Sequence, residues 1–118
     1  NANPITTMYY IEKKLIISAA HNLSLDYESK CNSIHGHNWV FIIYCKSKEL
    51  NHNGMVVDFH QIKELVSEKL DHHYINEVLN FHPTAENLAR WVVETVPHCY
   101  KCSVEETPNN IATYERDE

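Results

Sequence analysis

Glycine is almost absent from this sequence of 118 residues, which contains only Gly36 and Gly54. A phosphate-binding loop or a dinucleotide-binding fingerprint needs several glycines close together, because the backbone must approach the phosphates closely and adopt conformations that other residues avoid. The sequence therefore argues against ATPases, GTPases and dehydrogenases of the Rossmann type.

Basic residues are also few, with 10 Lys and Arg against 16 Asp and Glu, and the formal net charge is -6. Non-specific nucleic-acid binding requires a basic surface, so no nucleic-acid partner is expected. An anionic small substrate held by a local basic pocket remains compatible with this balance. Lys13, Lys30 and Arg90 are available for that purpose, but nothing in the sequence assigns one of them.

Long apolar runs are missing as well. The longest, from Trp39 to Cys45, is far shorter than the roughly 18 residues that suggest a membrane span. No signal-peptide pattern is visible, so we expect a cytoplasmic protein without membrane contact. The length suits one domain, predicted over residues 8–118, with residues 1–7 read as a tag or a disordered terminus.

The four cysteines are expected to be free thiols in a reducing compartment. Cys99 and Cys102 form one C-x₂-C pair, whereas a zinc ribbon needs two. We interpret these two as core and surface thiols. Cys45 lies within an apolar strand and is expected to be buried.

Periodicity predicts an α+β layout. Alternating and β-branched residues predict strands over 8–23 (ending near His21), 34–47, 100–107 and 111–117. A turn at 51–54 is expected to lead into a short returning strand segment over 55–59. Three- and four-residue spacing predicts helices over about 58–70, capped by Asp58 with Phe59 on its apolar face, and over about 84–96, capped by Thr84. The order favours an antiparallel sheet with two helices on one face.

Nine histidines are unusually many, and metal binding or acid–base chemistry are the obvious uses of imidazole. Alternate residues of a strand point to the same side, so His35 and His37 project together, and Gly36 leaves the other side bare. His21, at the end of the preceding strand, is the best third ligand if the two strands pair. Three histidines and an open fourth position are typical of catalytic zinc.

Cys31 has two chemical interpretations. It can be a fourth ligand that closes a structural zinc site, or it can stay off the metal and act as a base, with its thiolate favoured by the nearby zinc charge. A loop cysteine without a role is the simplest alternative. The residues alone leave all three open.

Two further clusters carry ionisable groups. In "LDHHYIN", Asp71 beside His72 and His73 is a combination that prepares a histidine for proton transfer, although a histidine at a helix end can also be stabilised by the helix dipole. In "VEETP", Glu105 and Glu106 face opposite sides of a strand. The inward one needs a partner, which a ligand with adjacent N–H donors would supply, unless both acids only protect an exposed edge.

Six segments together resemble the 6-pyruvoyl-tetrahydropterin synthase family. They are "SAAHNL", "CNSIHGHNW", "GMVVDFHQIK", "LDHHYIN", "HPTAENLA" and "VEETP", which occur in family order between Tyr9 and Tyr114. The three residues between Cys31 and His35 resemble the branch of the 6-carboxy-5,6,7,8-tetrahydropterin synthases, which serve queuosine synthesis. The pyruvoyl enzymes of animals carry a longer insertion there, and a further branch has glutamate in place of the cysteine.

The resemblance implies roles for particular residues. It implies zinc ligands His21, His35 and His37, catalytic residues Cys31, Asp71 and His72, a pterin anchor at Glu106 and a pterin-pocket residue at Thr84. A carboxylate at position 106 can accept two parallel hydrogen bonds from a pterin ring.

The resemblance also implies a fold and a reaction. The fold is the T-fold, a ββααββ unit whose sheets join between subunits into a barrel, with two trimers forming a hexamer. The substrate is 7,8-dihydroneopterin triphosphate, and the products are 6-carboxytetrahydropterin, acetaldehyde and triphosphate. The alternatives are a pyruvoyl-type pterin enzyme and a protein that binds zinc and pterin without turnover. A zinc enzyme of the cytidine-deaminase type is excluded, because the sequence has no H-x-E and no P-C-x-x-C.

Overall fold

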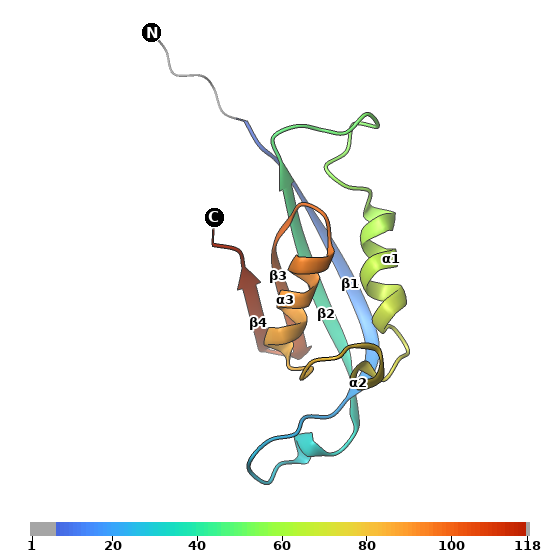
Figure 1. Ribbon diagram of the computed structural model, residues 1–118, viewed down its shortest axis with the longest axis vertical. Coiled ribbons are helices and arrows are strands. Elements are labelled where there is room, and N and C mark those ends of the chain that lie inside the picture. The colour runs from blue at the N-terminus through green and yellow to red at the C-terminus, as the bar shows by residue number, and fades with distance from the viewer. Residues whose placement is uncertain (1–6, 118) are drawn as a thin grey trace.

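The computed structural model describes residues 7–117 and contains one four-stranded antiparallel sheet in the order β1-β2-β3-β4 (Figure 1). The elements along the chain are β1 (Tyr9–His21), the short 3₁₀ helix η1 (Lys30–Asn32), β2 (His35–Ser47), α1 (Phe59–Leu70), α2 (Ile75–Val78), α3 (Ala85–Thr95), β3 (Cys99–Thr107) and β4 (Asn110–Glu115). The predicted ββααββ order is confirmed, with α2 as an addition. Of the predicted terminal segment 1–7, all but Thr7 lies outside the described residues.

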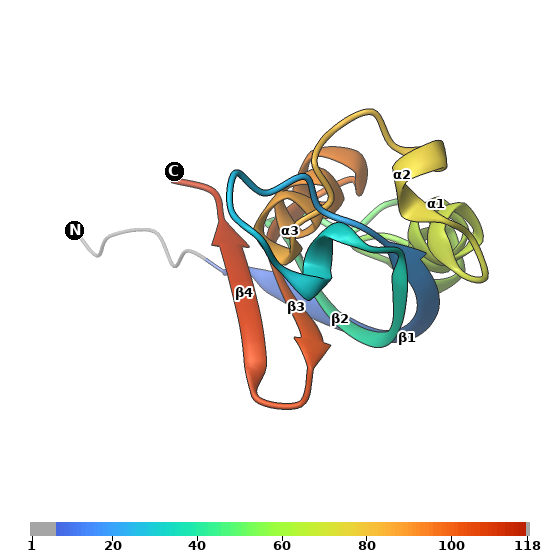
Figure 2. The same ribbon diagram turned by 90° about the horizontal axis from the view of Figure 1, so that it is seen from below.

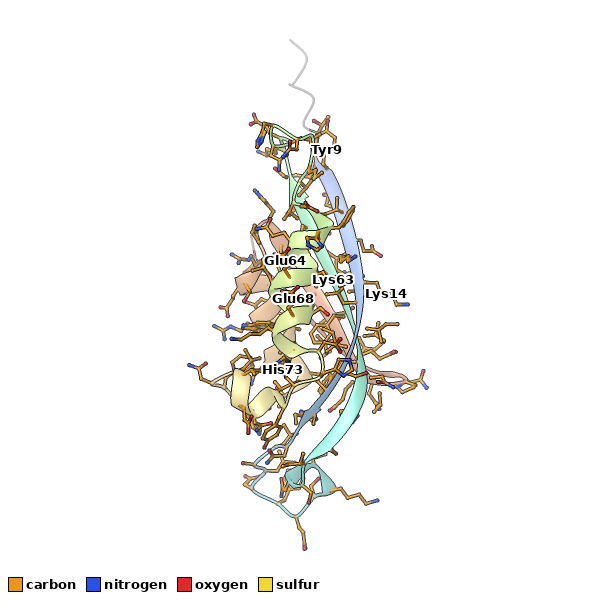
Figure 3. All side chains as sticks on the ribbon, turned by 90° about the vertical axis from the view of Figure 1, so that its right-hand side faces the viewer. Tyr9, Lys14, Lys63, Glu64, Glu68 and His73 are labelled. Atoms are coloured by element: carbon orange, nitrogen blue, oxygen red, sulfur yellow. The ribbon has the colours of Figure 1, made fainter. Side chains whose placement is uncertain are left out.

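Both main helices, α1 and α3, cover one face of the sheet and leave the other open (Figures 1 and 2). The buried positions of the strands alternate, as the pleat requires, and they include Ile17 on β1, Phe41 on β2 and Val104 on β3. Figure 3 shows Lys14 of β1 pointing away from α1, on the open side. Residues of odd number on β1 and β2 therefore face the helices.

Capping residues begin both helices, as predicted. The Asp58 carboxylate accepts a hydrogen bond from the His60 N–H at 2.8 Å, and the Thr84 hydroxyl accepts one from the Asn87 N–H at 3.2 Å. Phe59 is an exception to the predicted apolar face of α1, because its side chain is 49% exposed. Within residues 7–117, no helix has both the length and the apolar character needed to cross a membrane.

The predicted short return over 55–59 is wrong. Val56 and Val57 are buried, but they form no strand. The backbone groups of the neighbouring Met55 form hydrogen bonds within a turn instead. Its carbonyl oxygen accepts from the Asn51 N–H, and its N–H donates to Asn51 Oδ1. An apolar pair can thus be buried without joining a sheet ladder.

The segment after α1 runs along the outer edge of β1. The His72 N–H donates to Ser18 O at 2.7 Å, and the Ala20 N–H donates to His73 O at 3.1 Å. Ala20 and Tyr74 then form an isolated parallel bridge. These bonds place residues 71–74 at the end of β1, beside His21.

Candidate metal centre

Three histidines meet at one end of the sheet. His21 ends β1 and lies opposite His35 at the start of β2, while His37 lies opposite Ala19. All three occupy positions that face the helices, because their parity matches that of the buried residues of each strand. Their ring centroids are 4.5 Å (His21–His35), 5.2 Å (His21–His37) and 4.8 Å (His35–His37) apart.

Glu106 on β3 adds a fourth group that the sequence had not placed in this cluster. Its Oε1 lies 3.5 Å from His21 Nε2 and 3.6 Å from His37 Nε2. One ligand atom from each of the four residues lies within 4.8 Å of all the others. Because zinc–nitrogen bonds of about 2.0–2.1 Å at tetrahedral angles separate ligand atoms by about 3.3–3.4 Å, the group has dimensions that can hold a metal ion.

Backbone carbonyls orient two of the imidazoles. His21 Nδ1 lies 2.8 Å from Pro83 O, and His35 Nδ1 lies 2.7 Å from Ser33 O. A carbonyl oxygen only accepts, so each Nδ1 carries the proton and each Nε2 keeps a free lone pair. This is the usual way in which proteins prepare a histidine for a metal.

The Nε2 atoms of His21 and His37 are buried and have no hydrogen-bond partner among the described residues. A buried polar atom without a partner is costly, and a metal ion would remove that cost. The indole ring of Trp39 packs edge-on against both rings, at centroid distances of 4.7 Å and 5.1 Å. Trp39 is itself fixed by a 3.1 Å hydrogen bond from its Nε1 to Ala19 O. The donor set, its orientation and its unpartnered atoms fit a metal.

Burial lowers the pKa of His21 and of His37 below the ordinary value of 6.5, although Glu106 acts in the opposite direction on both. Both imidazoles are therefore neutral at pH 7. Metal ions bind the neutral imidazole, so this environment favours ligation without competition from protons.

Cys31 is not among the groups that converge on this cluster. It lies in η1, in the loop between β1 and β2, and is half-buried. Its carbonyl accepts a hydrogen bond from the Leu23 N–H at 2.8 Å, and its N–H donates to Ser29 Oγ at 3.1 Å. The loop is thereby folded back toward the end of β1.

Asp71 and His72 lie together at the edge of β1. Asp71 Oδ1 accepts a hydrogen bond from the Ser18 N–H at 2.9 Å, while its Oδ2 is 3.6 Å from His72 Nε2. The His72 side chain is 82% exposed, and its backbone has a φ of 60°. His72 and His37 both line a pocket of about 570 Å³, into which Gly36 presents no side chain.

The two residues with predicted substrate contacts lie near the start of α3. Thr84 is the N-cap of that helix, and its hydroxyl oxygen is used in the cap. Glu106 lines a pocket of about 240 Å³ together with Ala85 and Glu86. Glu105 faces the other side of the sheet, as the strand alternation predicts.

The 6-pyruvoyl tetrahydropterin synthase family model matches residues 10–117, which is nearly the whole chain. The chain belongs to this family. A 6-carboxy-5,6,7,8-tetrahydropterin synthase of Synechocystis sp. is 35% identical over 121 residues, covering 91% of this chain and 93% of the relative. Another of that name, from Bacillus subtilis, is 28% identical, with 90% of this chain and 84% of the relative covered.

A solved structure also matches. The 6-pyruvoyl tetrahydropterin synthase of Caenorhabditis elegans is 30% identical to this chain, with a TM-score of 0.73, covering 95% of this chain and 98% of that one. The four-stranded sheet with its helices is thus the T-fold of the family, as predicted.

The sequence did not single out the residues that hold the family's motifs together. Asn22, directly after His21, exchanges two hydrogen bonds of 3.0 Å with Asn76 and accepts one from the Tyr74 hydroxyl. Pro83 supplies the carbonyl that orients His21. These residues lie within the quoted motifs, but the sequence carries no sign of which motif touches which.

The lowered histidine pKa values predict an acid-sensitive metal-free protein. At pH values below 6.5 the unfolded chain takes up protons at His21 and His37 that the folded chain resists, so stability rises with pH through this range. We expect the full contribution above pH 6.5 and its progressive loss as the pH falls toward the lowered pKa values. Urea unfolding of chelator-treated protein between pH 5 and pH 8 measures this. If the urea concentration at the unfolding midpoint stayed constant as the pH was lowered below 6.5, the lowered pKa values of His21 and His37 would be contradicted.

Proposed function

We propose that this family member is a zinc-dependent 6-carboxy-5,6,7,8-tetrahydropterin synthase acting in the cytoplasm, in the synthesis of queuosine or a related 7-deazapurine. It would convert 7,8-dihydroneopterin triphosphate and water into 6-carboxytetrahydropterin, acetaldehyde and triphosphate. The observation that carries the proposal is the convergence of three imidazoles, with Cys31 in the preceding loop outside their cluster. The short spacing from Cys31 to His35 and the two relatives of that name support the carboxy branch.

His21, His35 and His37 would hold the zinc, since neutral imidazoles with free Nε2 atoms are the nitrogen ligands that zinc prefers. Zinc supplies a Lewis acid that makes neighbouring hydroxyl groups more acidic. A pocket of about 570 Å³ lies at this end of the two strands and is lined by Gly36, His37 and His72 among others.

Cys31 and the pair of Asp71 and His72 would move the protons. Elimination of triphosphate requires a proton to leave a side-chain carbon, and a thiolate or a neutral imidazole can accept it. Asp71 is held by the Ser18 N–H and would stabilise His72 in its protonated form. The two carriers come from different segments, η1 and the connection after α1, so they would reach the substrate from two directions.

Glu106 would anchor the pterin ring, with its carboxylate accepting hydrogen bonds from the ring N–H and amino groups. It is 27% exposed, whereas His21 is fully buried, so a ligand can reach Glu106 from solvent. Thr84, at the start of α3, would contribute to the same pocket.

Replacing Glu106 with glutamine tests the anchor. The amide offers one acceptor and places a donor against a donor of the ring, so we expect pterin affinity to fall by about 1.5–3 kcal/mol, equivalent to roughly 10- to 150-fold. Fluorescence titration with a pterin measures the affinity, and metal analysis measures the zinc. Glu105→Gln is the matched control, since it changes the neighbouring acid on the opposite face. Loss of zinc with unchanged pterin affinity would instead make Glu106 a metal ligand.

The edges of the sheet support an assembly. β1 and β4 are edge strands, and the open face carries Ile16 and Ile111 with exposures of 65% and 61%. Exposed edges and apolar residues favour pairing between copies. We propose that the sheets of three subunits join into a barrel and that two trimers form a hexamer, in which neighbouring subunits cover the exposed His72. Light scattering of the purified protein tests the mass, and a monomer at micromolar concentration would oppose this assembly.

A 6-pyruvoyl-tetrahydropterin synthase is the second candidate, because the 30% identity to the Caenorhabditis elegans structure lies between the 35% and 28% identities to the two carboxy relatives. Incubation of the zinc-loaded protein with 7,8-dihydroneopterin triphosphate, followed by mass spectrometry, separates the two. Acetaldehyde with 6-carboxytetrahydropterin supports the carboxy branch. A pyruvoyl product would overturn the assignment to the carboxy branch but not the assignment of the site residues. Binding without turnover would indicate a protein that only binds zinc and pterin.

A further inference from the structure

Two of the buried cysteines face each other at the other end of the same two strands. Cys45 near the end of β2 lies opposite Cys99 at the start of β3. The register shifts between Tyr44 and Cys45, because Tyr44 pairs with Lys101 while Cys45 pairs with Cys99. The extra residue on β3 turns Cys99 to the helix-covered face, so that both thiols point into the same space.

The hydrogen bonds around this pair show its geometry. The Lys46 N–H donates to His98 O at 3.0 Å, and the Cys99 N–H donates to Val96 O rather than to Cys45. This is the pattern of a non-hydrogen-bonded antiparallel pair, in which the Cα atoms lie about 4.5 Å apart. A disulfide accepts Cα separations of roughly 4.4–6.8 Å, and facing residues of two paired strands lie in this range.

The two thiols differ in reactivity. They hydrogen bond to each other, and this bond lowers the pKa of Cys99 while it raises that of Cys45. Arg116 also lowers the pKa of Cys99, although burial acts against both effects. The Arg116 guanidinium is fixed by a 3.1 Å hydrogen bond to Val93 O. The Cys99 thiol also donates to Lys101 O at 3.4 Å, so the positive charge of Arg116 is the feature that favours its thiolate.

A basic surface pocket reaches Cys99. The pocket has a volume of about 420 Å³ and is lined by Lys46, Lys48, His98 and Arg116 as well as by Cys99 itself. Cys99 is 4% exposed to solvent, whereas Cys45 and Cys102 are fully buried. Both members of the C-x₂-C pair are therefore buried, contrary to the predicted core and surface thiols. A small oxidant can reach Cys99 first, in a setting where positive charge favours the thiolate.

We propose that Cys99 and Cys45 form a peroxide-sensitive thiol pair that closes into a disulfide. The Cys99 thiolate attacks one oxygen of a hydroperoxide, an S–O bond forms, and the O–O bond breaks with release of hydroxide or alkoxide. Cys45 then attacks the sulfur of this sulfenic acid, the S–S bond forms, and its proton leaves with the departing hydroxide as water. The two thiols together supply the two electrons that reduce the peroxide. This modification site is separate from the zinc site and does not depend on the proposed enzyme activity.

Peptide mapping tests the pair. The full-length zinc-loaded protein is treated with hydrogen peroxide, remaining thiols are alkylated, and the protein is digested with trypsin. Cleavage after Arg90 and Lys101 places Cys99 in peptide 91–101, apart from Cys102, while Cys45 lies in peptide 31–46 with Cys31. We expect these two peptides to be linked, and the link to vanish under dithiothreitol. Chymotrypsin, which cleaves between Cys31 and Cys45, then shows that Cys45 is the partner.

Variants separate the roles of the two thiols. Cys45→Ala is expected to leave Cys99 as a sulfenic acid that a 1,3-dione traps, whereas Cys102→Ala, the matched control, is expected to keep the link. If Cys45→Ala does not fold, the wild-type map decides alone. A link through Cys31 or Cys102, oxidation of Cys99 without loss of the Cys45 thiol, or an unmodified pair after Cys31 has been oxidised would overturn the proposal.

Discussion

Replacing His37 with alanine is expected to remove bound zinc and with it almost all turnover. The change deletes one of three imidazoles that would hold the metal. Loss of an outer partner of a metal ligand already costs about 10- to 100-fold in affinity, so loss of the ligand itself should cost more than about 100-fold. Zinc content after dialysis, measured by mass spectrometry, reports the effect directly.

Stability measurements distinguish loss of metal from loss of fold. His37 Nε2 is buried without a hydrogen-bond partner among the described residues, so its removal costs the metal-free protein little. We therefore expect metal-free wild type and His37→Ala to unfold at similar urea concentrations, and only the wild type to gain stability when zinc is added. His60→Ala is the matched control, because His60 lies exposed on α1, where it pairs with Glu64. Full zinc occupancy in His37→Ala would contradict the ligand assignment.

Replacing Cys31 with alanine is expected to abolish turnover while zinc remains bound. Cys31 is half-buried in η1, outside the group of converging ligand atoms, so its loss leaves that group intact. A positioned acid–base group contributes about 10²–10⁴-fold to a rate, and we expect a decrease of that size. The rate of product formation with the substrate at saturation measures it.

The controls for Cys31 follow from the loop in which it lies. Glu28→Gln changes an exposed residue of the same loop and is expected to keep the wild-type rate. Cys31→Ser keeps the size of the side chain but not its acidity, so it should resemble the alanine variant. Wild-type turnover in Cys31→Ala would remove its catalytic role, and simultaneous loss of zinc would make it a ligand.

Much of the fold was predictable from local patterns. The alternation along β1 and β2 placed His35 and His37 on one face, and the length of the two strands brought His21 beside them. Asp58 and Thr84 marked the starts of both helices, because a cap is a local interaction.

Other features depended on contacts that no short pattern encodes. The position of Glu106 at the cluster follows from the pairing of β3 with β2 and from the irregular register near the end of β3. The buried valines at 56 and 57 suggested a strand because burial and strand formation share the same residue types. The bulge that turns Cys99 toward Cys45 likewise arises from the register of two strands that lie far apart in the sequence.

X-ray absorption at the zinc edge tests most directly whether three imidazoles hold the metal while Cys31 stays off it. We predict nitrogen and oxygen ligands at about 2.0–2.1 Å, a clear contribution from imidazole rings, and no sulfur at about 2.3 Å. Such a spectrum leaves the thiol free to act as a base in the proposed reaction. A sulfur ligand in the resting wild-type protein would instead indicate a closed structural site and would contradict the proposed catalytic zinc.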